Sequence, residues 1–186
     1  MIASPPPPAL LMTPDERRRW LLSLWRYAVP ALISALMVVL MLAPLPLPVP
    51  AMPNLALLAV LAWVMLQPAL MPPWLAFVVG ALGDLLFGMP LGVNATLFAV
   101  AAGSIRLLDL LLVDRSHLAD WLGSSLLVLA CALATGPLMA LAGRPVPVLP
   151  MLWQVLTSMI AWPLLLSACV AVQRRLARSA PSWRHG

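Results

Sequence analysis

The chain has 186 residues, of which 63% are hydrophobic and only 9% are charged. A soluble domain carries about a quarter charged residues, so this composition excludes the soluble class and indicates a membrane protein with several apolar helices. The net charge is +5, and the eleven basic residues are all arginines near the ends of apolar segments. That placement is typical of membrane topology signals rather than of nucleic-acid binding.

The chain begins with a proline-rich stretch, residues 1–12, which we expect to be disordered. Residues 13–26 predict a basic interfacial helix, because Thr13 and Glu16 match a capping box and tryptophans stand among the arginines. The same residues fit the charged flank of the first membrane helix equally well. The arginines expected to contact lipid headgroups or to set topology here are Arg17, Arg18, Arg19 and Arg26.

Six apolar segments follow, within a transmembrane domain predicted over residues 27–172, so the expected fold class is all-α and polytopic. Prolines mark most of their boundaries, since proline is tolerated at a first helical position. Pro137 and Pro163 instead fall inside apolar runs and predict kinks. The helices are expected over residues 27–43, 55–70, 74–87, 93–108, 121–141 and 151–172, with a charged loop over 109–120.

The arginine distribution predicts that both termini are cytoplasmic. With six crossings, ten of the eleven arginines fall on the side of the termini, and only Arg144 falls on the other side. The cytoplasmic set includes a basic tail, residues 173–186, in which Arg174, Arg175 and Arg178 are expected to contribute to topology and lipid contact. We therefore expect a multi-pass protein of a bacterial inner membrane.

A single carboxylate stands in the middle of this apolar chain. Within "GDLLFGMPLGVN", Asp84 is the only charged residue between Arg26 and Arg106. The third segment is about 21 Å long as a helix, against a hydrocarbon core of about 30 Å. Asp84 is therefore expected near mid-membrane, with the following turn in the outer leaflet. Two short spans and a re-entrant hairpin both fit this arithmetic.

Broken backbone at that depth needs hydrogen-bond partners. Asp84 is placed to accept from backbone N–H groups of residues 88–92, and Asn94 is expected to cap the fourth helix. An intramembrane acid also suggests ion coupling or partner contact, so three roles for Asp84 stay open. The glycines expected to let backbones approach closely are Gly80, Gly83, Gly88 and Gly92.

Signs of catalysis are missing from the sequence. His117 and His185 lack metal-binding neighbours, and Cys131 and Cys169 lie inside apolar runs without a CxxC spacing. Polar residues within the apolar segments are too few for the convergent midplane site of a transporter. We therefore expect neither enzymatic activity nor a cofactor or metal.

The stretch "GALGDLLFGMPLGVNATLFAV", with "PNL" opening the second segment, resembles the rod shape-determining protein MreD family. The resemblance covers about residues 44–106, and elsewhere it extends only to hydropathy and length. The residues that carry the pattern are Gly80, Gly83, Asp84, Gly88, Pro90, Leu91, Gly92, Asn94 and Ala95.

This resemblance implies a non-catalytic inner-membrane scaffold of the bacterial cell-elongation machinery. The implied partners are MreC, a single-span coiled-coil protein, and through it the MreB cytoskeleton, the RodA glycosyltransferase and a penicillin-binding transpeptidase. The family's fold is thought to resemble the substrate-binding subunits of ECF-type vitamin transporters. The alternative function is therefore a small-solute binding subunit of a membrane transporter.

Overall fold

The computed structural model describes residues 28–43, 52–111 and 117–178. These residues form helices and no strand, which confirms the all-α fold class. The proline-rich stretch 1–12, the predicted interfacial helix 13–26 and the four arginines Arg17, Arg18, Arg19 and Arg26 lie outside the described residues. The proline-rich connection 44–51 and the loop 112–116 lie outside them as well.

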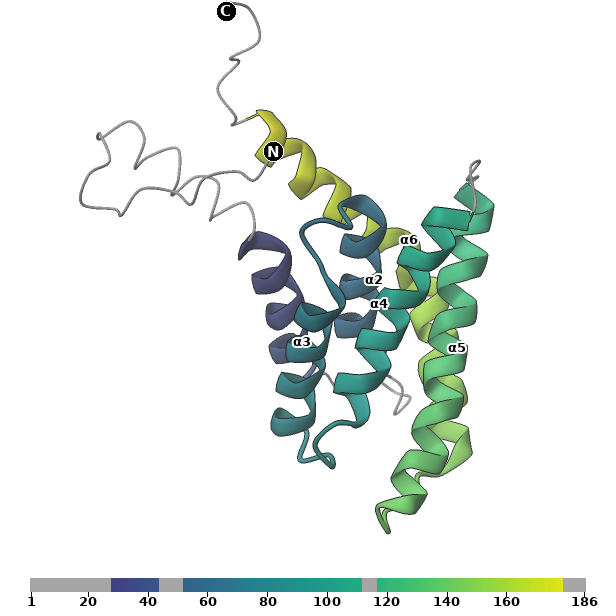
Figure 1. Cartoon of the computed structure of the whole chain (residues 1–186). Helices are drawn as coiled ribbons and strands as arrows, with labels where there is room; N and C mark the ends of the chain where they lie inside the picture. The colour runs from purple at the N-terminus through teal and green to yellow at the C-terminus, as the bar shows by residue number, and fades with distance from the viewer. Residues whose placement is uncertain (1–27, 44–51, 112–116, 179–186) are drawn as a thin grey trace, which may run out of the picture.

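Figure 1 shows the helices as one bundle in which long helices lie beside shorter ones. Two described helical stretches, Asp120–Leu141 and Val148–Arg175, are long and apolar enough to cross a membrane by length and composition. The helices, in chain order, are the first described helix Ala28–Leu40, α2 Leu55–Leu66, α3 Pro73–Leu86, α4 Val93–Leu111, α5 His117–Leu141 and α6 Val148–Arg178.

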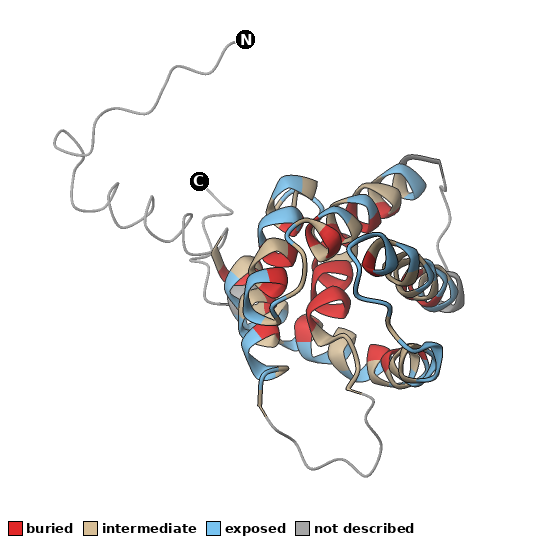
Figure 2. Cartoon of the chain, turned by 90° about the horizontal axis from the view of Figure 1, so that it is seen from below, coloured by how far each residue is buried: buried red, intermediate tan, exposed pale blue. Residues whose placement is uncertain are grey.

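α2 is the central element of the bundle. Nine consecutive residues, Ala56 to Val64, are buried on every side of this helix, and Figure 2 shows buried residues concentrated at the centre of the bundle. A helix that is apolar all round is stable only when neighbours cover it. α3, α4, α5 and α6 all contact α2. Because protein rather than lipid surrounds α2, its length need not match the membrane thickness.

α2 ends four residues earlier than its apolar run predicts. The helix stops at Leu66, and Gln67 leaves the helical conformation with φ −148° and ψ 81°. Pro68 explains this end, because its ring disfavours helical backbone in the residue before it. The expected helix over 55–70 is therefore wrong in its last turn.

The charged loop expected over residues 109–120 is mostly helical instead. α4 continues to Leu111 and α5 begins at His117. α6 likewise extends beyond the expected 151–172, from Val148 through Arg178, so Arg174 and Arg175 stand on its last turns. Pro137 and Pro163 lie inside α5 and α6, as expected.

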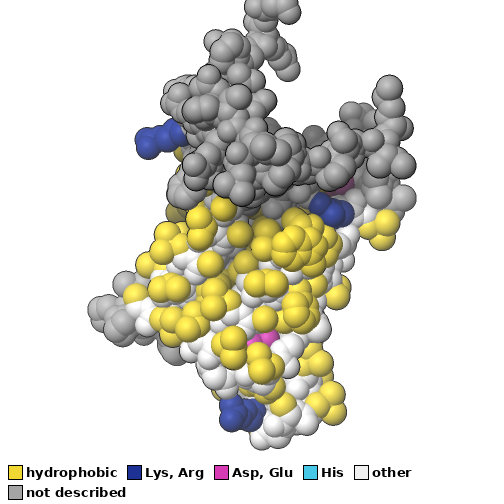
Figure 3. All heavy atoms as spheres, turned by 60° about the vertical axis from the view of Figure 1, so that its left-hand side comes forward, with side chains coloured by type: hydrophobic (Ala, Val, Ile, Leu, Met, Phe, Trp, Pro, Cys, Tyr) yellow, Lys and Arg dark blue, Asp and Glu magenta, His cyan; other side chains and the backbone are white. Residues whose placement is uncertain are grey.

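The outer surface of the bundle is strongly apolar. Figure 3 shows hydrophobic side chains over the middle of one face and basic side chains toward its two ends. Soluble monomers rarely expose apolar patches of this extent, whereas lipid requires them. Large exposed side chains occur on α3, α4, α5 and α6, and include Trp74, Leu85, Val100, Leu126, Ile160 and Leu164.

Candidate functional site: the Asp84 hairpin

α3 and α4 pack against each other along their length and are joined by a tight turn. α3 ends at Leu86, and Gly88 follows with a positive φ of 61°. The N–H of Met89 then donates to the backbone carbonyl of Asp84 at 2.9 Å. This bond and the left-handed glycine form a Schellman-type helix end, which satisfies a carbonyl that the helix leaves unpaired.

The Asp84 side chain reaches from the end of α3 to the start of α4. It is fully buried, and its carboxylate accepts three backbone N–H groups. Gly92 donates to Oδ2 at 2.9 Å, Asn94 donates to Oδ1 at 3.0 Å, and Ala95 donates to Oδ2 at 3.2 Å. The carboxylate therefore replaces the partners that the first turn of α4 lacks.

These bonds account for the first turn of α4. The remaining N–H group, that of Val93, donates to the carbonyl of Pro90 at 3.4 Å. The N–H of Thr96 donates to the carbonyl of Gly92 and makes the first hydrogen bond within the helix. A carboxylate at a helix N-terminus is also stabilised by the positive end of the helix dipole. Asp84 thus closes α3 with its backbone and caps α4 with its side chain.

The expectation that Asn94 caps α4 is wrong. Asn94 is the second residue of the helix, and its side-chain nitrogen lies 3.3 Å from the sulfur of Met89. The expected donors to Asp84, in residues 88–92, are replaced in part by Asn94 and Ala95. The physical reason is that a helix start offers several convergent N–H groups, whereas a turn offers few.

Gly80 is where α3 and α4 come closest. A Cβ atom added to Gly80 would lie 2.5 Å from the carbonyl oxygen of Asn94 and 2.7 Å from the Cα of Ala95. Both distances are shorter than any real contact, and both partners are backbone atoms that cannot rotate away. Only glycine at position 80 lets the start of α4 pack this closely on α3.

The other three glycines act differently from Gly80. A Cβ on Gly83 would make ordinary contact with the Val38 side chain at 3.8 Å. At Gly88 and Gly92 a Cβ would meet no atom within 4 Å, but both residues have positive φ, 61° and 106°. Backbone conformation rather than close approach therefore requires glycine at these two turn positions.

Arg144 connects this hairpin to the turn between α5 and α6. Gly143, with φ 72°, ends α5 in the same way that Gly88 ends α3, and the N–H of Arg144 donates to Met139 O at 2.9 Å. The Arg144 guanidinium then donates to the carbonyl of Gly88 at 2.8 Å. From the sequence alone, Arg144 was expected only as a topology signal. Glycine and proline on either side of it were the available sign of a helix end.

Asn54 is a second residue whose role was not predicted from the sequence. Its side chain accepts from the N–H of Leu57 at 3.1 Å and caps α2, while its own N–H donates to the Ser158 hydroxyl of α6 at 2.9 Å. A cavity of about 250 Å³ lies beside it, between the hairpin and α2, α5 and α6. The polar side chains that line this cavity are Asn54, Asn94, Thr135 and Gln154.

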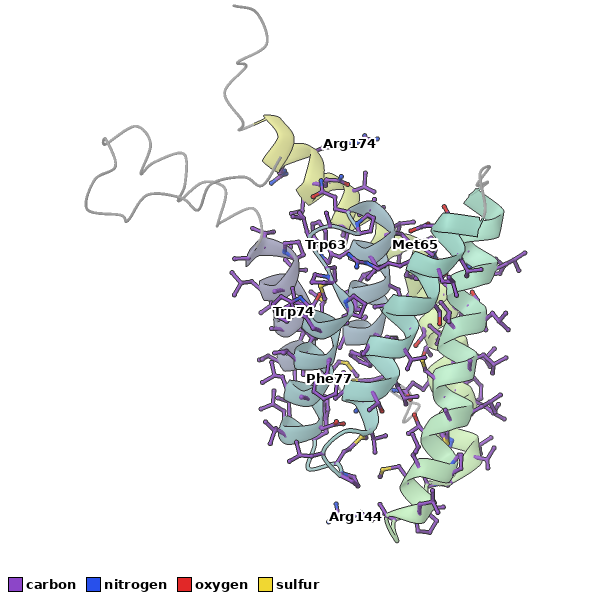
Figure 4. The ribbon with its side chains drawn as sticks, viewed as in Figure 1. Trp63, Met65, Trp74, Phe77, Arg144 and Arg174 are labelled. Atoms are coloured by element: carbon purple, nitrogen blue, oxygen red, sulfur yellow. The ribbon has the colours of Figure 1, made fainter. Side chains whose placement is uncertain are left out.

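The arginines expected at the membrane surface are only partly described. Arg174 and Arg175 are exposed on the last turns of α6, and the side chain of Arg178 lies outside the described part. Figure 4 places Arg174 and Arg144 at opposite ends of the bundle. The Arg106 guanidinium donates to the carbonyl of Pro68, where α2 gives way to α3.

The hydrogen bonds of Asp84 fix the geometry of the hairpin. Both oxygens of Asp84 are held by backbone N–H groups. Within the described ranges, no group of three or more His, Cys, Asp or Glu side chains stands close enough to hold a metal ion. What the arrangement can do is hold two short helices in a fixed relative position.

Comparison with known proteins identifies the family. No curated protein and no solved structure matches the chain. The model of the family described as rod shape-determining protein MreD matches residues 23–170, which include the whole Asp84 hairpin and confirm the resemblance seen in the sequence. Members of that family are structural membrane components of rod-shape determination rather than known enzymes. The chain therefore belongs to the MreD family of rod shape-determining proteins.

Proposed function

We propose that this chain is a non-catalytic inner-membrane scaffold of the cell-elongation machinery. It binds an MreC-like single-span coiled-coil protein and so links the MreB cytoskeleton to peptidoglycan synthesis by RodA and its transpeptidase. The observation that carries this proposal is the family match over residues 23–170. A scaffold needs a surface of fixed shape, and the Asp84 and Arg144 hydrogen bonds supply a physical means to keep one.

The proposal includes a multi-pass topology with both termini in the cytoplasm. The arginine counts favour it, since one basic residue is assigned to the outer side and ten to the inner side. The positions of Arg144 and Arg174 at opposite ends of the bundle are compatible with it (Figure 4). In this orientation, the turns at Gly88 and Gly143 face the periplasm.

The first experiment is depletion in the native rod-shaped host, followed by complementation. Depleted cells are expected to round up, and the wild-type chain is expected to restore rods. The tagged chain should co-purify with a single-span coiled-coil membrane protein. If depleted cells keep their rod shape, or if no such partner is recovered under crosslinking, the scaffold role is wrong.

The cavity beside Asn54 favours a second candidate function, binding of a small solute. Its volume of about 250 Å³ approaches the range of about 300–1,000 Å³ that is typical of ligand sites, and amide and hydroxyl groups line it. Ligand screening by thermal shift on the purified chain separates this function from the scaffold role. A solute that stabilises the wild-type chain but not Gln154→Leu supports the solute-binding function, and a screen without such a solute counts against it.

A further inference from the structure

α5 and α6 contact each other but diverge toward the end of the bundle that carries Arg174. Figure 1 shows the upper end of α6 well separated from the upper end of α5, and a cavity of about 740 Å³ lies between the two helices there. We call this cavity the α5–α6 wedge. Its lining includes Trp121 on α5 and Trp162, Leu166, Ser167, Val170 and Arg174 on α6.

Pro163 contributes to the wedge through the backbone of α6. Proline has no N–H, so the carbonyl four residues earlier, that of Met159, lacks its helical donor. The indole N–H of Trp121 on α5 donates to this carbonyl at 3.4 Å. The hydrogen bond joins the two helices beside the wedge and gives this carbonyl a partner from outside its own helix.

The walls of the wedge are apolar and its mouth is basic. Trp162 is only 2% exposed, and Leu166 and Val170 continue the apolar lining along α6. Arg174 and Arg175 follow at the end of the helix, and Asp120 is the acidic residue among the lining. Asp120 and Arg175 are engaged in interactions of their own, so Arg174 is the cation that we assign to a ligand.

We infer that the α5–α6 wedge binds an anionic phospholipid, with the phosphate against Arg174 and an acyl chain along Trp162, Leu166 and Val170. Three features together fit this class of molecule: apolar walls, an arginine at the mouth, and a place at the end of membrane-length helices. Basic pockets between membrane helices select anionic headgroups. A soluble anion would use the mouth but would leave the apolar walls uncovered.

The inference does not depend on the scaffold role, because it concerns lipid binding by the isolated chain. The test uses the full chain purified from nanodiscs that contain phosphatidylcholine with or without phosphatidylglycerol. Lipid retained after gentle detergent extraction is counted by native mass spectrometry. We expect phosphatidylglycerol to be retained in preference to phosphatidylcholine, and excess inorganic phosphate not to displace it.

Two variants test the two parts of the site separately. Arg174→Gln removes the headgroup contact and is expected to weaken phosphatidylglycerol retention about fivefold. Ser167→Phe places a large side chain in the wedge and leaves Arg174 in place. Among the described residues, the Ser167 hydroxyl donates only to the carbonyl of Leu164 on its own helix, so its loss breaks no contact between helices. It should reduce retention as well. Arg184→Gln, which removes the same charge from the C-terminal segment outside the described residues, should retain lipid as the wild type does.

Several results would overturn the inference. Equal retention of the two lipids, or equal phosphatidylglycerol retention by wild type and Arg174→Gln, would exclude headgroup recognition at this site. Displacement by inorganic phosphate would indicate a soluble-anion site instead. Retention by Ser167→Phe at the wild-type level, in a variant whose circular dichroism shows native helix content, would exclude the wedge as the acyl-chain site.

Discussion

The hydrogen bonds of Asp84 explain how a carboxylate is accommodated in the middle of an apolar chain. Its carbonyl accepts from Met89 and its carboxylate accepts from Gly92, Asn94 and Ala95, so one residue satisfies backbone groups of two helices. In hydrocarbon each unsatisfied N–H costs several kcal/mol, by order of magnitude. The three N–H donors thus stabilise the buried carboxylate, and the carboxylate in turn stabilises the start of α4.

Replacing Asp84 should loosen the hairpin. Asp84→Ala leaves three N–H groups without their acceptor, at about 1–3 kcal/mol for each unsatisfied buried group. Asp84→Asn should lie between alanine and wild type, since an amide keeps one acceptor oxygen and turns a donor toward the N–H groups. The unfolding temperatures of the three purified proteins measure this order of stability. Wild-type stability of both variants would exclude the capping role.

Gly80 should tolerate no side chain at all. Gly80→Ala places a Cβ 2.5 Å from the Asn94 carbonyl, and overpacking of this kind costs about 1–3 kcal/mol. Gly103→Ala is the matched control, because it lies on α4 and a Cβ there would meet no atom within 4 Å. We expect a lower unfolding temperature for Gly80→Ala only. Similar values for the two variants would contradict the close approach of α3 and α4.

At the scale of elements, two helix ends of the same design meet on one side of the bundle. α3 ends at Gly88 and α5 ends at Gly143, both with positive φ, and Arg144 joins the two turns through the Gly88 carbonyl. The link spans 56 residues of sequence. It couples the α3–α4 hairpin to the long pair α5 and α6, whose connecting turn extends beyond the hairpin turn (Figure 1).

Loss of the Arg144 link should free the hairpin turn without unfolding the bundle. Arg144→Gln is too short to keep the bond to Gly88, and a single exposed hydrogen bond contributes about 1 kcal/mol. Hydrogen exchange of the amides in residues 88–92 should therefore become faster. Arg174→Gln, at the opposite end of the bundle, serves as the control and should leave that exchange unchanged.

The stability contributed by the hydrogen bond from Trp121 to α6 should depend on Pro163. Trp121→Phe removes the donor to the Met159 carbonyl, and Pro163→Ala returns a helical N–H to that carbonyl. A double-mutant cycle on unfolding free energy should therefore show a coupling of about 0.5–1 kcal/mol. Additive effects of the two substitutions would mean that the indole N–H does not compensate for the proline.

At the scale of the whole molecule, the bundle places its shortest labelled helix at the centre. α2 has 12 residues and is about 18 Å long, well short of a bilayer core of about 30 Å. It is buried among α3, α4, α5 and α6, while the outer faces of its neighbours are apolar. In the proposed membrane topology, a helix this short is accommodated because protein, rather than lipid, surrounds it.

The proposed topology predicts opposite accessibility for the two ends of the bundle. Cys131 and Cys169 are the free cysteines of the described residues, and alanine replaces both in the test. A cysteine introduced by Arg144→Cys should react with a membrane-impermeant maleimide in intact spheroplasts. One introduced by Ser179→Cys, just after α6, should react only after permeabilisation. Reaction of both in intact cells would contradict cytoplasmic termini.

Much of this protein was predictable from local sequence features. Continuous apolar runs indicate the all-helical class, and Gly88, Pro90 and Gly92 mark the break between α3 and α4. The isolated Asp84 beside that break, with its neighbours, was enough to recognise the family. These features are local, because a helix break and its glycines depend on the conformation of adjacent residues.

Other features depend on segments that packing brings together. The bond from Arg144 to Gly88 spans 56 residues and the bond from Asn54 to Ser158 spans 104, and no local pattern specifies such partners. Asn94 is itself the second residue of α4 and so stands past the cap position, whereas packing brings the Asp84 carboxylate from α3 to the N–H groups of that turn. The end of α2 and the length of α6 also differ from their apolar runs. Hydropathy reports the solvent that a segment prefers, whereas backbone hydrogen bonds and neighbouring helices set where it ends and what it meets.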